Sequence, residues 1–421
     1  MNVGVIGLGY VGLPLLVELG KSGFKATGID IDATKVQAIN RGTSYIDDVP
    51  SSDLKKLVEA NLLQATTDWN MISELDAISI CVPTPLRKTK DPDISYIVST
   101  VEQIAPRIKA GQIIILESTT YPGTTEELLL PEFEKSGLRA GQDFFLAFSP
   151  ERVDPGNAQF NTKNTPKIVG GCTPHCGAKA TEFYAKVFDT VVPVSTARCA
   201  EMVKLLENTF RSVNIGLVNE VAVMCEKLSL DVWEVIDAAA TKPFGFMPFY
   251  PGPGLGGHCI PIDPHYLSWK LKALNYTARF IELASEINSH MPDFVVDKII
   301  RALNNHKKPV NGSRILMVGV AYKANVNDVR ESPALDIIAL LEKLQANVEY
   351  HDSFVPMLDE HGITKSSVDL TVERLTQADC VVITTNHSDL NLDLVASHAH
   401  LIIDTRNALK NIPAKGVVEK L

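Results

Sequence analysis

The first thirty residues constrain the fold most, because they carry a strand, a glycine-rich turn and a helix in immediate succession. Asn2–Ile6 is a short apolar β run, and Gly7–Gly12 has the sequence GLGYVG. An apolar helical pattern follows to about Gly20, and a second β run, Lys25–Ile29, ends at Asp30. Glycines of this spacing between a strand and a helix, with an acidic residue after the next strand, predict a dinucleotide-binding α/β fold.

Each residue of this turn has a distinct task in such a fold. Gly7 permits the tight turn, Gly9 lets a pyrophosphate approach the backbone, and Gly12 packs closely against the strand. The helix N-terminus faces the phosphates, and Asp30 accepts hydrogen bonds from the ribose diol and repels a 2′-phosphate. The cofactor predicted is therefore NAD, not NADP. The residues expected around it also include members of the turn and of VPTP and EST, which follow later strands: Tyr10, Val11, Pro83, Thr84, Ser118 and Thr119.

Further strands alternate with helices, which predicts a parallel sheet with helices on its faces. These strands are predicted at Ala77–Val82, Gln112–Leu116, Phe144–Phe148, Lys167–Val169 and Val191–Val194. With them, the first domain extends to residue 195.

The C-terminal segment repeats the opening arrangement after a linker at Pro309–Gly312. It has GVAYKA where the first domain has GLGYVG, so we expect a second doubly wound domain that binds something other than a dinucleotide. The fold class predicted is α/β, with two Rossmann-like doubly wound domains (1–195 and 309–421) joined by a helical middle (196–308). The four strands that echo the first four are Arg314–Gly319, Asn347–Asp352, Cys380–Thr384 and Leu401–Asp404.

One long central helix is expected from about Thr196 to Leu228. Lys204, Asn208 and Arg211 form a polar face of this helix. An apolar stripe occupies a different face and consists of Met202, Leu206, Phe210, Val213, Leu217 and Val221.

Composition excludes several classes of function. The chain has 421 residues, a formal net charge of −10 and no basic block, which argues against a nucleic-acid partner. Its seven scattered cysteines favour reduced thiols and a cytoplasmic location. The CTPHC stretch at 172–176 has no second ligand pair, so no metal is predicted. Residues 3–19 lack a charged flank and a cleavage site, and Glu18 interrupts them, so neither a signal peptide nor a membrane partner is expected.

Cys259 lies in the irregular stretch GPGLGGHCIPIDP, residues 252–264. It could be a buried thiol that acts as a small hydrophobe in a tight connection. In a dinucleotide enzyme it could instead be a nucleophile, because oxidation of an aldehyde to an acid requires a tetrahedral adduct that expels a second hydride. A thiolate forms that adduct, and an activated water hydrolyses the resulting thioester.

Such a site needs support for an oxyanion and a carboxylate that activates water. Lys204 and Asn208 are four residues apart on one helix, so both can face the same atom. Asp263 follows Cys259 by four residues, and Glu151 lies in SPERVDPGN after a strand end. Lys204 could equally be a solvated helix residue and Asp263 a turn former.

Several motifs together resemble the UDP-glucose/UDP-hexosamine dehydrogenase family over essentially the whole chain. SPERVDPGN and ATKPFGFMPFYPGPGLGGHCIPIDP are similar to the branch that acts on UDP-N-acetylglucosamine. The remaining matching motifs are GLGYVG, VPTP, EST, EMVKLLENTFRSVNIGLVNE (201–220) and GVAYKANVNDVRESP (319–333).

This resemblance implies roles for the matching residues. Cys259 is the nucleophile, Lys204 and Asn208 stabilise oxyanions with Asp263 beside them, Thr119 orients a water, and Glu151 supports thioester hydrolysis. Arg330 is expected near the cofactor at a domain interface. The substrate-binding residues implied are Glu151, Arg152, Val153, Lys204, Asn208, Arg211, Phe249, Tyr250, Gly252, Gly254, Gly256, His258 and Lys323.

Two departures disfavour glucose as the sugar. UDP-glucose enzymes carry Phe-Leu-Ala after the glutamate, where this chain has Arg152-Val153-Asp154, and they have an arginine near the position of Lys242.

The function expected is an NAD-dependent, four-electron oxidation at C6 of UDP-N-acetyl-D-glucosamine to the uronic acid, which would supply a surface-polysaccharide precursor. A homodimer with its seam along the long helix is implied by the resemblance. The alternatives are UDP-N-acetyl-D-mannosamine or UDP-glucose as substrate, a single-hydride hydroxyacid dehydrogenase, and a non-catalytic NAD-binding regulator. The hydroxyacid type needs neither Cys259 nor a second α/β domain.

Overall fold

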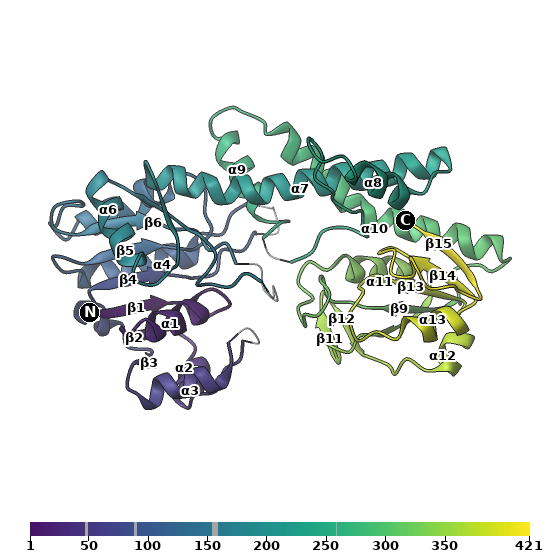
Figure 1. Ribbon diagram of the computed structural model, residues 1–421, viewed down its shortest axis with the longest axis horizontal. Coiled ribbons are helices and arrows are strands. Elements are labelled where there is room, and N and C mark those ends of the chain that lie inside the picture. The colour runs from purple at the N-terminus through teal and green to yellow at the C-terminus, as the bar shows by residue number, and fades with distance from the viewer. Residues whose placement is uncertain (47–48, 88–90, 154–158, 258) are drawn as a thin grey trace. The chain divides into compact units, whose positions relative to one another are not determined.

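The structure is a computed structural model that describes residues 1–46, 49–87, 91–153, 159–257 and 259–421 (Figure 1). The chain divides into two compact units. The first consists of Met1–Glu207 with His265–Tyr276, and the second of Asn208–Pro264 with Thr277–Leu421. Each unit has its own sheet and its own core.

The sheet of the first unit has the strand order β3-β2-β1-β4-β5-β6-β7-β8. Neighbouring strands are parallel except β6 and β7, which are antiparallel. The order reverses direction between β1 and β4, and in such sheets ligands bind outside the carboxyl ends of the strands at this point. The strands are β1 (Asn2–Ile6), β2 (Lys25–Ile29), β3 (Leu63–Thr66), β4 (Ala77–Ile80), β5 (Ile113–Leu116), β6 (Phe145–Phe148), β7 (Lys167–Gly171) and β8 (Val191–Val194).

Helices cover both faces of this sheet and enclose two hydrophobic cores (Figure 1). One core takes side chains from α1 (Gly12–Lys21), α2 (Ala33–Asn40), α3 (Ser51–Glu59) and α6 (Pro174–Tyr184). The other takes side chains from η1 (Trp69–Glu74), α4 (Ser95–Ile104), η2 (Ala105–Arg107), η3 (Thr125–Leu129), α5 (Leu130–Glu134) and the start of α7 (Ala197–Leu228). The predicted doubly wound domain is confirmed.

The sheet of the second unit is parallel with the order β10-β9-β13-β14-β15, which repeats β2-β1-β4-β5-β6 of the first. This confirms the predicted internal repeat. Its strands are β9 (Arg314–Val318), β10 (Asn347–His351), β13 (Cys380–Ile383), β14 (Leu401–Asp404) and β15 (Val417–Lys420), with an antiparallel pair β11 (Met357–Glu360) and β12 (Ile363–Ser366) beside them.

The repeat extends to the turn after the first strand of each sheet. Gly7 and Gly319 have φ of +86° and +84°, and the next N–H donates to Asp30 or Asp352 at 2.7 Å. Asp352 also accepts a hydrogen bond from the buried ring of His387 at 3.0 Å. The second turn therefore has the architecture of a dinucleotide fold. Its carboxylate, however, is already hydrogen-bonded to the His387 ring and does not serve as an acceptor for a ribose.

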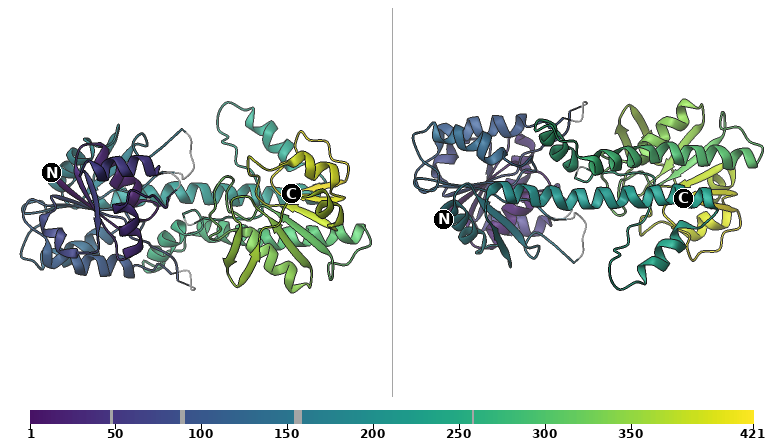
Figure 2. Two further views of the ribbon diagram at one scale, coloured as in Figure 1. Left: turned by 90° about the horizontal axis from the view of Figure 1, so that it is seen from below. Right: turned by 90° about the horizontal axis from the view of Figure 1, so that it is seen from above.

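Helices of the second unit pack on its sheet and on one another. Asn219 on α7 donates to Asn288 on α10 at 2.8 Å, and Glu226 pairs with Lys298 and Arg301 at 2.9 and 2.6 Å. The two helices therefore lie side by side within this unit (Figure 2). The remaining helices of this unit are α8 (Val232–Ala240), α10 (Arg279–Asn305), α11 (Pro333–Lys343), α12 (Val372–Gln377) and α13 (Leu392–His398), whereas α9 (Asp263–Lys272) belongs to the first unit from His265 onward.

The predicted long helix α7 is confirmed. On this helix, apolar side chains are exposed and polar side chains are buried, which is the reverse of the usual arrangement. Leu206 and Leu217 of the apolar stripe are 58% and 54% exposed, whereas the polar Lys204 and Asn208 are only 9% and 6% exposed. Burial of a charge and an amide on one face of a helix requires polar partners there. The face of α7 that carries Lys204 and Asn208 is therefore a candidate for a functional site.

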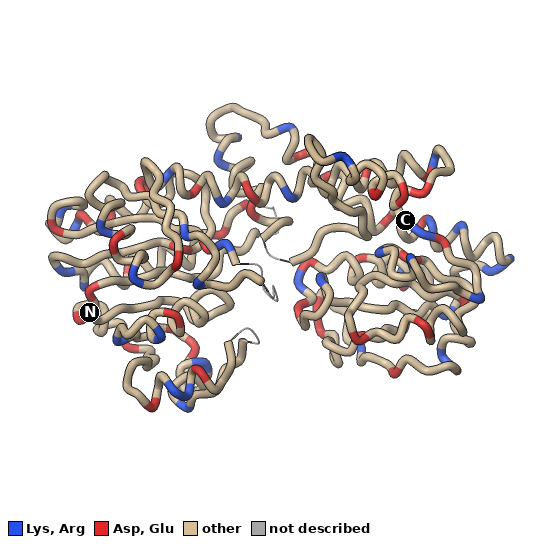
Figure 3. Tube along the Cα trace, in the orientation of Figure 1, with Lys and Arg blue, Asp and Glu red and all other residues tan. Residues whose placement is uncertain are grey.

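Charged residues of both signs are interspersed along the trace of each unit (Figure 3). Some form small networks, such as Lys21 with Glu18 and Asp53 at 3.0 Å each. Among the residues that the structure describes, none of the helices has the length and apolar character needed to cross a bilayer.

Candidate active site

The turn after β1 has the geometry that a bound dinucleotide requires. Gly7 has φ of +86°, and a Cβ on Gly12 would lie 1.8 Å from the carbonyl oxygen of Gly7. A Cβ on Gly9, in contrast, would meet no heavy atom within 4 Å. The first and third glycines thus serve packing, and open space at the second is where a pyrophosphate can approach the backbone.

Asp30 is held at the end of β2 by the backbone around it. Its Oδ2 accepts from the N–H of Leu8 at 2.7 Å, and its Oδ1 accepts from Asp32 at 2.9 Å. The ammonium of Lys35 lies 3.9 Å from Oδ2. Each carboxylate oxygen has two lone pairs, so the fixed carboxylate keeps acceptor capacity for a ribose diol.

Residues after β4 and β5 lie at the same edge of the sheet as this turn. The carbonyl of Thr84 accepts from the hydroxyl of Tyr266 at 3.1 Å, and the hydroxyl of Ser118 donates to the carbonyl of Ile80 at 3.3 Å. Ser118 is buried. Five further residues predicted around the cofactor are half-buried or exposed: Tyr10, Val11, Pro83, Thr84 and Thr119.

Glu151 lies just beyond β6 and is fixed at both its side chain and its backbone. Its Oε1 accepts from the N–H groups of Arg152 and Val153 at 2.6 and 2.8 Å. The ammonium of Lys204 donates to its carbonyl oxygen at 2.7 Å. Within the first unit, the structure therefore brings the predicted Glu151 and Lys204 together, and it adds Lys167, 3.3 Å from Oε2 of Glu151.

Arg152 is tied to α7 by a two-pronged ion pair. Its Nε and Nη2 lie 3.2 and 2.6 Å from the carboxylate of Glu207, and its Nη1 donates to the carbonyl of Pro166 at 2.7 Å. A guanidinium has five N–H donors, so two of them have no partner among the described residues.

The second unit joins Cys259, Asp263 and Asn208. The backbone N–H of Asp263, the first residue of α9, donates to the carbonyl of Cys259 at 2.8 Å. The amide of Asn208 donates to the carboxylate of Asp263 at 2.5 Å, and Asp263 is 2% exposed. The thiol of Cys259 is exposed. Cys259 is thus an accessible thiol in a turn that a buried carboxylate and α7 hold in place, and not a small buried hydrophobe.

The glycine-rich loop before Cys259 packs tightly against the second sheet's loops. A Cβ on Gly252 would lie 2.6 Å from Nη1 of Arg406, and one on Gly256 would lie 2.5 Å from Cβ of Tyr322. A Cβ on Gly254 would lie 2.9 Å from a carbon of Pro333. Close approach to the protein's own side chains therefore explains these glycines in the structure.

Arg406 is a basic residue that the sequence analysis missed. Its Nε donates to the carbonyl of Thr384 at 2.8 Å, and burial lowers the pKa of its guanidinium to about 10. No carboxylate forms an ion pair with it among the described residues. A desolvated cation without an anionic partner beside a glycine loop favours an anionic ligand such as a diphosphate.

Two further predicted residues lie on the loop after β9. The guanidinium of Arg330 forms two hydrogen bonds with the carboxylate of Asp328, at 2.9 and 2.7 Å, and its carbonyl accepts from Gly257 at 3.0 Å. Lys323 is half-buried on the same loop.

The aromatic residues of the FYPGPG segment pack within the second unit. The ring of Phe249 contacts that of Phe210 (5.7 Å between centroids), and Tyr250 stacks on Trp233 at 5.8 Å. Arg211 is exposed on α7. His258, which was predicted to bind substrate, lies outside the described residues.

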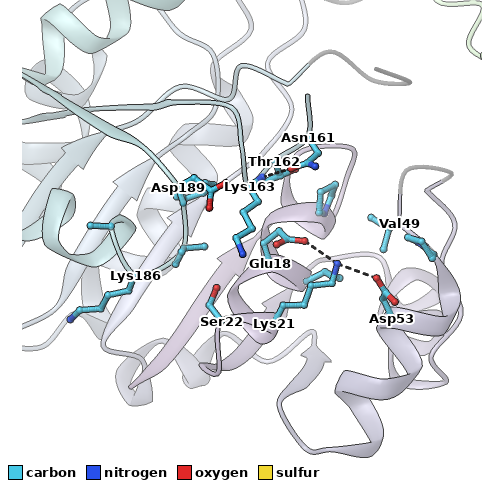
Figure 4. A pocket seen from close by; sticks show the side chains of 16 residues that line it. Glu18, Lys21, Ser22, Val49, Asp53, Asn161, Thr162, Lys163, Lys186 and Asp189 are labelled. Atoms are coloured by element: carbon cyan, nitrogen blue, oxygen red, sulfur yellow. Dashed lines mark hydrogen bonds and ion pairs between the residues drawn. The ribbon is translucent and has the colours of Figure 1, made fainter. Parts of the chain in front are cut away.

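A cavity of about 790 Å³ lies elsewhere in the first unit (Figure 4). Its lining includes the C-terminal half of α1 and residues 185–189, with Lys21, Lys163 and Lys186. None of the predicted catalytic, cofactor-binding or substrate-binding residues lines it. We therefore assign the candidate active site from residue geometry rather than from this cavity.

In a comparison with known protein families, three consecutive segments of this chain match the three domains of one family. Residues 1–188 match the NAD binding domain of the UDP-glucose/GDP-mannose dehydrogenase family, 198–290 its central domain and 316–411 its UDP binding domain. The chain belongs to this family. It is therefore an NAD-dependent UDP-sugar dehydrogenase, as the motifs predicted, and its glycine turn and Asp30 fit that cofactor.

Individual relatives differ in the sugar that their names give. UDP-N-acetyl-D-glucosamine 6-dehydrogenase of Pseudomonas aeruginosa is 36% identical over 86% of this chain and 86% of its own. UDP-N-acetyl-D-mannosamine dehydrogenase of Escherichia coli is 35% identical over 96% of this chain and 98% of its own. The solved UDP-D-ManNAc dehydrogenase of Pyrococcus horikoshii superposes with a TM-score of 0.91 at 32% identity, covering 100% and 99% of the two chains.

Proposed function

We propose that this dehydrogenase oxidises C6 of UDP-N-acetyl-D-glucosamine to the uronic acid through a thioester on Cys259. The observation that carries the proposal is the exposed Cys259 thiol on a turn tied to the buried pair Asp263 and Asn208. NAD, which the turn Gly7–Gly12 and Asp30 would hold, would supply the hydride acceptor for each of the two oxidations. UDP-N-acetyl-D-mannosamine is the second candidate, because relatives of nearly equal identity carry that name.

Cys259 adds to C6 after the first oxidation has produced an aldehyde. Formation of the C–S bond turns the carbonyl oxygen into an oxyanion, which the ammonium of Lys204 and the amide of Asn208 stabilise. Loss of the second hydride leaves a thioester. Asp263 fixes the amide of Asn208 through their 2.5 Å hydrogen bond, which uses one of the two amide N–H donors and leaves the second for the reacting oxygen.

Glu151 and Thr119 act in the last step. A water oriented by Thr119 adds to the thioester, its proton passes toward the carboxylate of Glu151, and the C–S bond breaks to return the Cys259 thiolate. The ordered carboxylate of Glu151 supports this role, because two backbone N–H groups fix its Oε1.

The second unit holds the nucleotide in this proposal. Arg406, a half-buried cation beside Gly252, supplies charge for the diphosphate, and Lys323 on the loop after β9 contacts the nucleotide-sugar. Arg330 is proposed to contact the cofactor. The domain limits proposed are 1–195 for NAD, 196–308 for the helical middle and 309–421 for UDP.

Arg152 is proposed to recognise the N-acetyl group of the substrate through hydrogen bonds. Its guanidinium is fixed by Glu207 and Pro166 and has two N–H groups without a described partner, which suit an acetamido carbonyl. Loss of one such hydrogen bond costs about 1–3 kcal/mol, or roughly tenfold to a hundredfold. We expect kcat/KM for UDP-N-acetyl-D-glucosamine to exceed that for UDP-glucose by at least this factor, and Arg152→Ala to shrink the ratio.

Steady-state rates on UDP-N-acetyl-D-glucosamine, UDP-N-acetyl-D-mannosamine and UDP-glucose measure this preference. Arg139→Ala, at an exposed arginine outside the site, is the matched control and should leave the ratios unchanged. Equal efficiency on the first and third sugars would exclude the assignment, and a preference for the mannosamine sugar would select the second candidate.

The exposed stripe of α7 is proposed as the seam of a homodimer. Leu206, Phe210, Leu217, Met224 and Leu228 are all exposed on this one helix. Exposed apolar patches of this kind mark interaction sites. We expect light scattering to give the mass of two chains, and Leu217→Glu to give that of one; a monomeric wild-type protein would contradict the proposal.

A further inference from the structure

Lys167 is brought to the candidate site by the antiparallel pairing of β6 with β7 in the first sheet. Strand β7 runs opposite to β6, and Phe148 pairs with Gly170. Continued three residues beyond the end of β6, the same register places Lys167 opposite Glu151. The beginning of β7 therefore lies where the parallel strands end.

The ammonium of Lys167 bridges two carboxylates in the protein interior. It lies 2.6 Å from Oε2 of Glu117 and 3.3 Å from Oε2 of Glu151, and its side chain is 4% exposed. Glu117 also accepts from the hydroxyl of Tyr184, which contacts Ser79 at 2.9 Å. The network thus anchors Lys167 on its far side to β4, β5 and α6.

Among the residues that the structure describes, these contacts leave Glu151 with one free direction for a ligand. Both lone pairs of its Oε1 are taken by the N–H groups of Arg152 and Val153, and one of Oε2 by Lys167. A water that binds this carboxylate is therefore directed to the remaining position on Oε2.

Burial and the surrounding cations and N–H groups act on the ionisation of Glu151 in opposite directions. Burial raises the pKa of Glu151, but the cation of Lys167, the two backbone N–H groups and Lys204 together hold it below its usual value. Burial raises the pKa of Glu117, which faces Lys167 from the other side. Tyr184 and the thiol of Cys81 also face this cluster, and burial raises the pKa of each.

We propose that Lys167 is a positioning residue that keeps Glu151 ionised and turns its one free lone pair toward the water that hydrolyses the thioester. The proposal rests on the proposed function, because it presupposes a hydrolytic step on Cys259. Lys167 itself need not touch the substrate. Its partners Glu117, Tyr184 and Ser79 serve to hold the ammonium in place.

The test compares Lys167→Met with Lys167→Arg in the full-length enzyme with UDP-N-acetyl-D-glucosamine. Without the cation, the pKa of Glu151 rises, so its protonated form, which cannot accept a proton from water, persists to higher pH. We expect the acid limb of the kcat profile to move up by about one pH unit or more in Lys167→Met. The acyl-enzyme should accumulate in the intact mass, while the first hydride transfer in a single turnover stays close to the wild-type rate.

Lys167→Arg keeps the charge and should restore the wild-type pH profile. Lys163→Met, at an exposed lysine on the same segment, is the matched control and should change neither readout. Because Lys167→Met leaves Glu117 buried without its cation, the double variant Lys167→Met/Glu117→Gln removes that charge. Thermal melting checks that it folds, and the slow hydrolysis should persist in it.

Three outcomes would overturn the proposal. Lys167 does not act through Glu151 if the folded Lys167→Met or double variant shows no acyl adduct and the acid limb of its kcat–pH profile is not shifted. Equal loss of the first hydride transfer and of hydrolysis assigns Lys167 a purely structural role. A wild-type enzyme that forms one NADH per sugar and no acid removes the proposed function as well, which distinguishes the two failures.

Discussion

Replacing Cys259 with alanine is expected to lower the rate of uronic acid formation by about a thousandfold or more, since no thioester can form without the thiolate. Any NADH that the variant still produces should not exceed one equivalent per sugar, because the second hydride leaves only from a tetrahedral adduct. Product acid measured by chromatography and NADH measured by absorbance report the two quantities separately.

Cys199→Ala is the matched control for this variant, because Cys199 is another exposed free cysteine and lies on α7. It should retain wild-type turnover. Full acid formation by Cys259→Ala would show that Cys259 is not the nucleophile and would leave its turn a structural connection.

Replacing Glu151 with glutamine is expected to slow thioester hydrolysis by about a hundredfold to ten-thousandfold, the usual contribution of a positioned acid or base. The amide can still accept from the N–H groups of Arg152 and Val153, but it cannot take a proton from water. A covalent adduct of substrate mass should therefore build up on the protein, visible by intact mass spectrometry after an acid quench.

Glu102→Gln, at an exposed glutamate on α4, makes the same chemical change outside the site and should show no adduct. Unchanged turnover of Glu151→Gln without any adduct would remove Glu151 from the mechanism. Loss of activity with no adduct and no first hydride transfer would instead assign it to an earlier step.

Local sequence predicted the two α/β sheets well, because their signals are confined to short segments. Gly7 and Asp30 are separated by only one helix and one strand, and Gly319 and Asp352 repeat that arrangement with almost the same φ and the same 2.7 Å contact. A turn that needs positive φ leaves a direct mark on the sequence, since few residues other than glycine adopt it.

Periodicity located the faces of α7 but could not tell which face is covered. The apolar stripe containing Leu206 and Leu217 would ordinarily be assigned to the core, yet the structure exposes it and buries Lys204 and Asn208. The pattern of a helix records which residues share a face. What covers that face depends on segments distant in sequence, here Glu151 for Lys204 and Asp263 for Asn208.

Lys167 and Arg406 were missed for the same physical reason. Lys167 begins the strand KIVGG and was interpreted only as part of it, because its link to Glu151 arises from the antiparallel register of β7. Arg406 follows β14, and its place beside Gly252 depends on contacts across about 150 residues of chain. A charged residue at the start of a buried strand, as for Lys167, or just after one, as for Arg406, is the local signal that could have drawn attention to them.

The measurement that tests the central claim most directly is the amount of NADH formed per sugar when limiting UDP-N-acetyl-D-glucosamine is consumed to completion with excess NAD. A route through a Cys259 thioester predicts two equivalents of NADH, one equivalent of uronic acid and little free aldehyde. One equivalent of NADH with an aldehyde or ketone product would contradict the account and assign the chain to single-hydride chemistry.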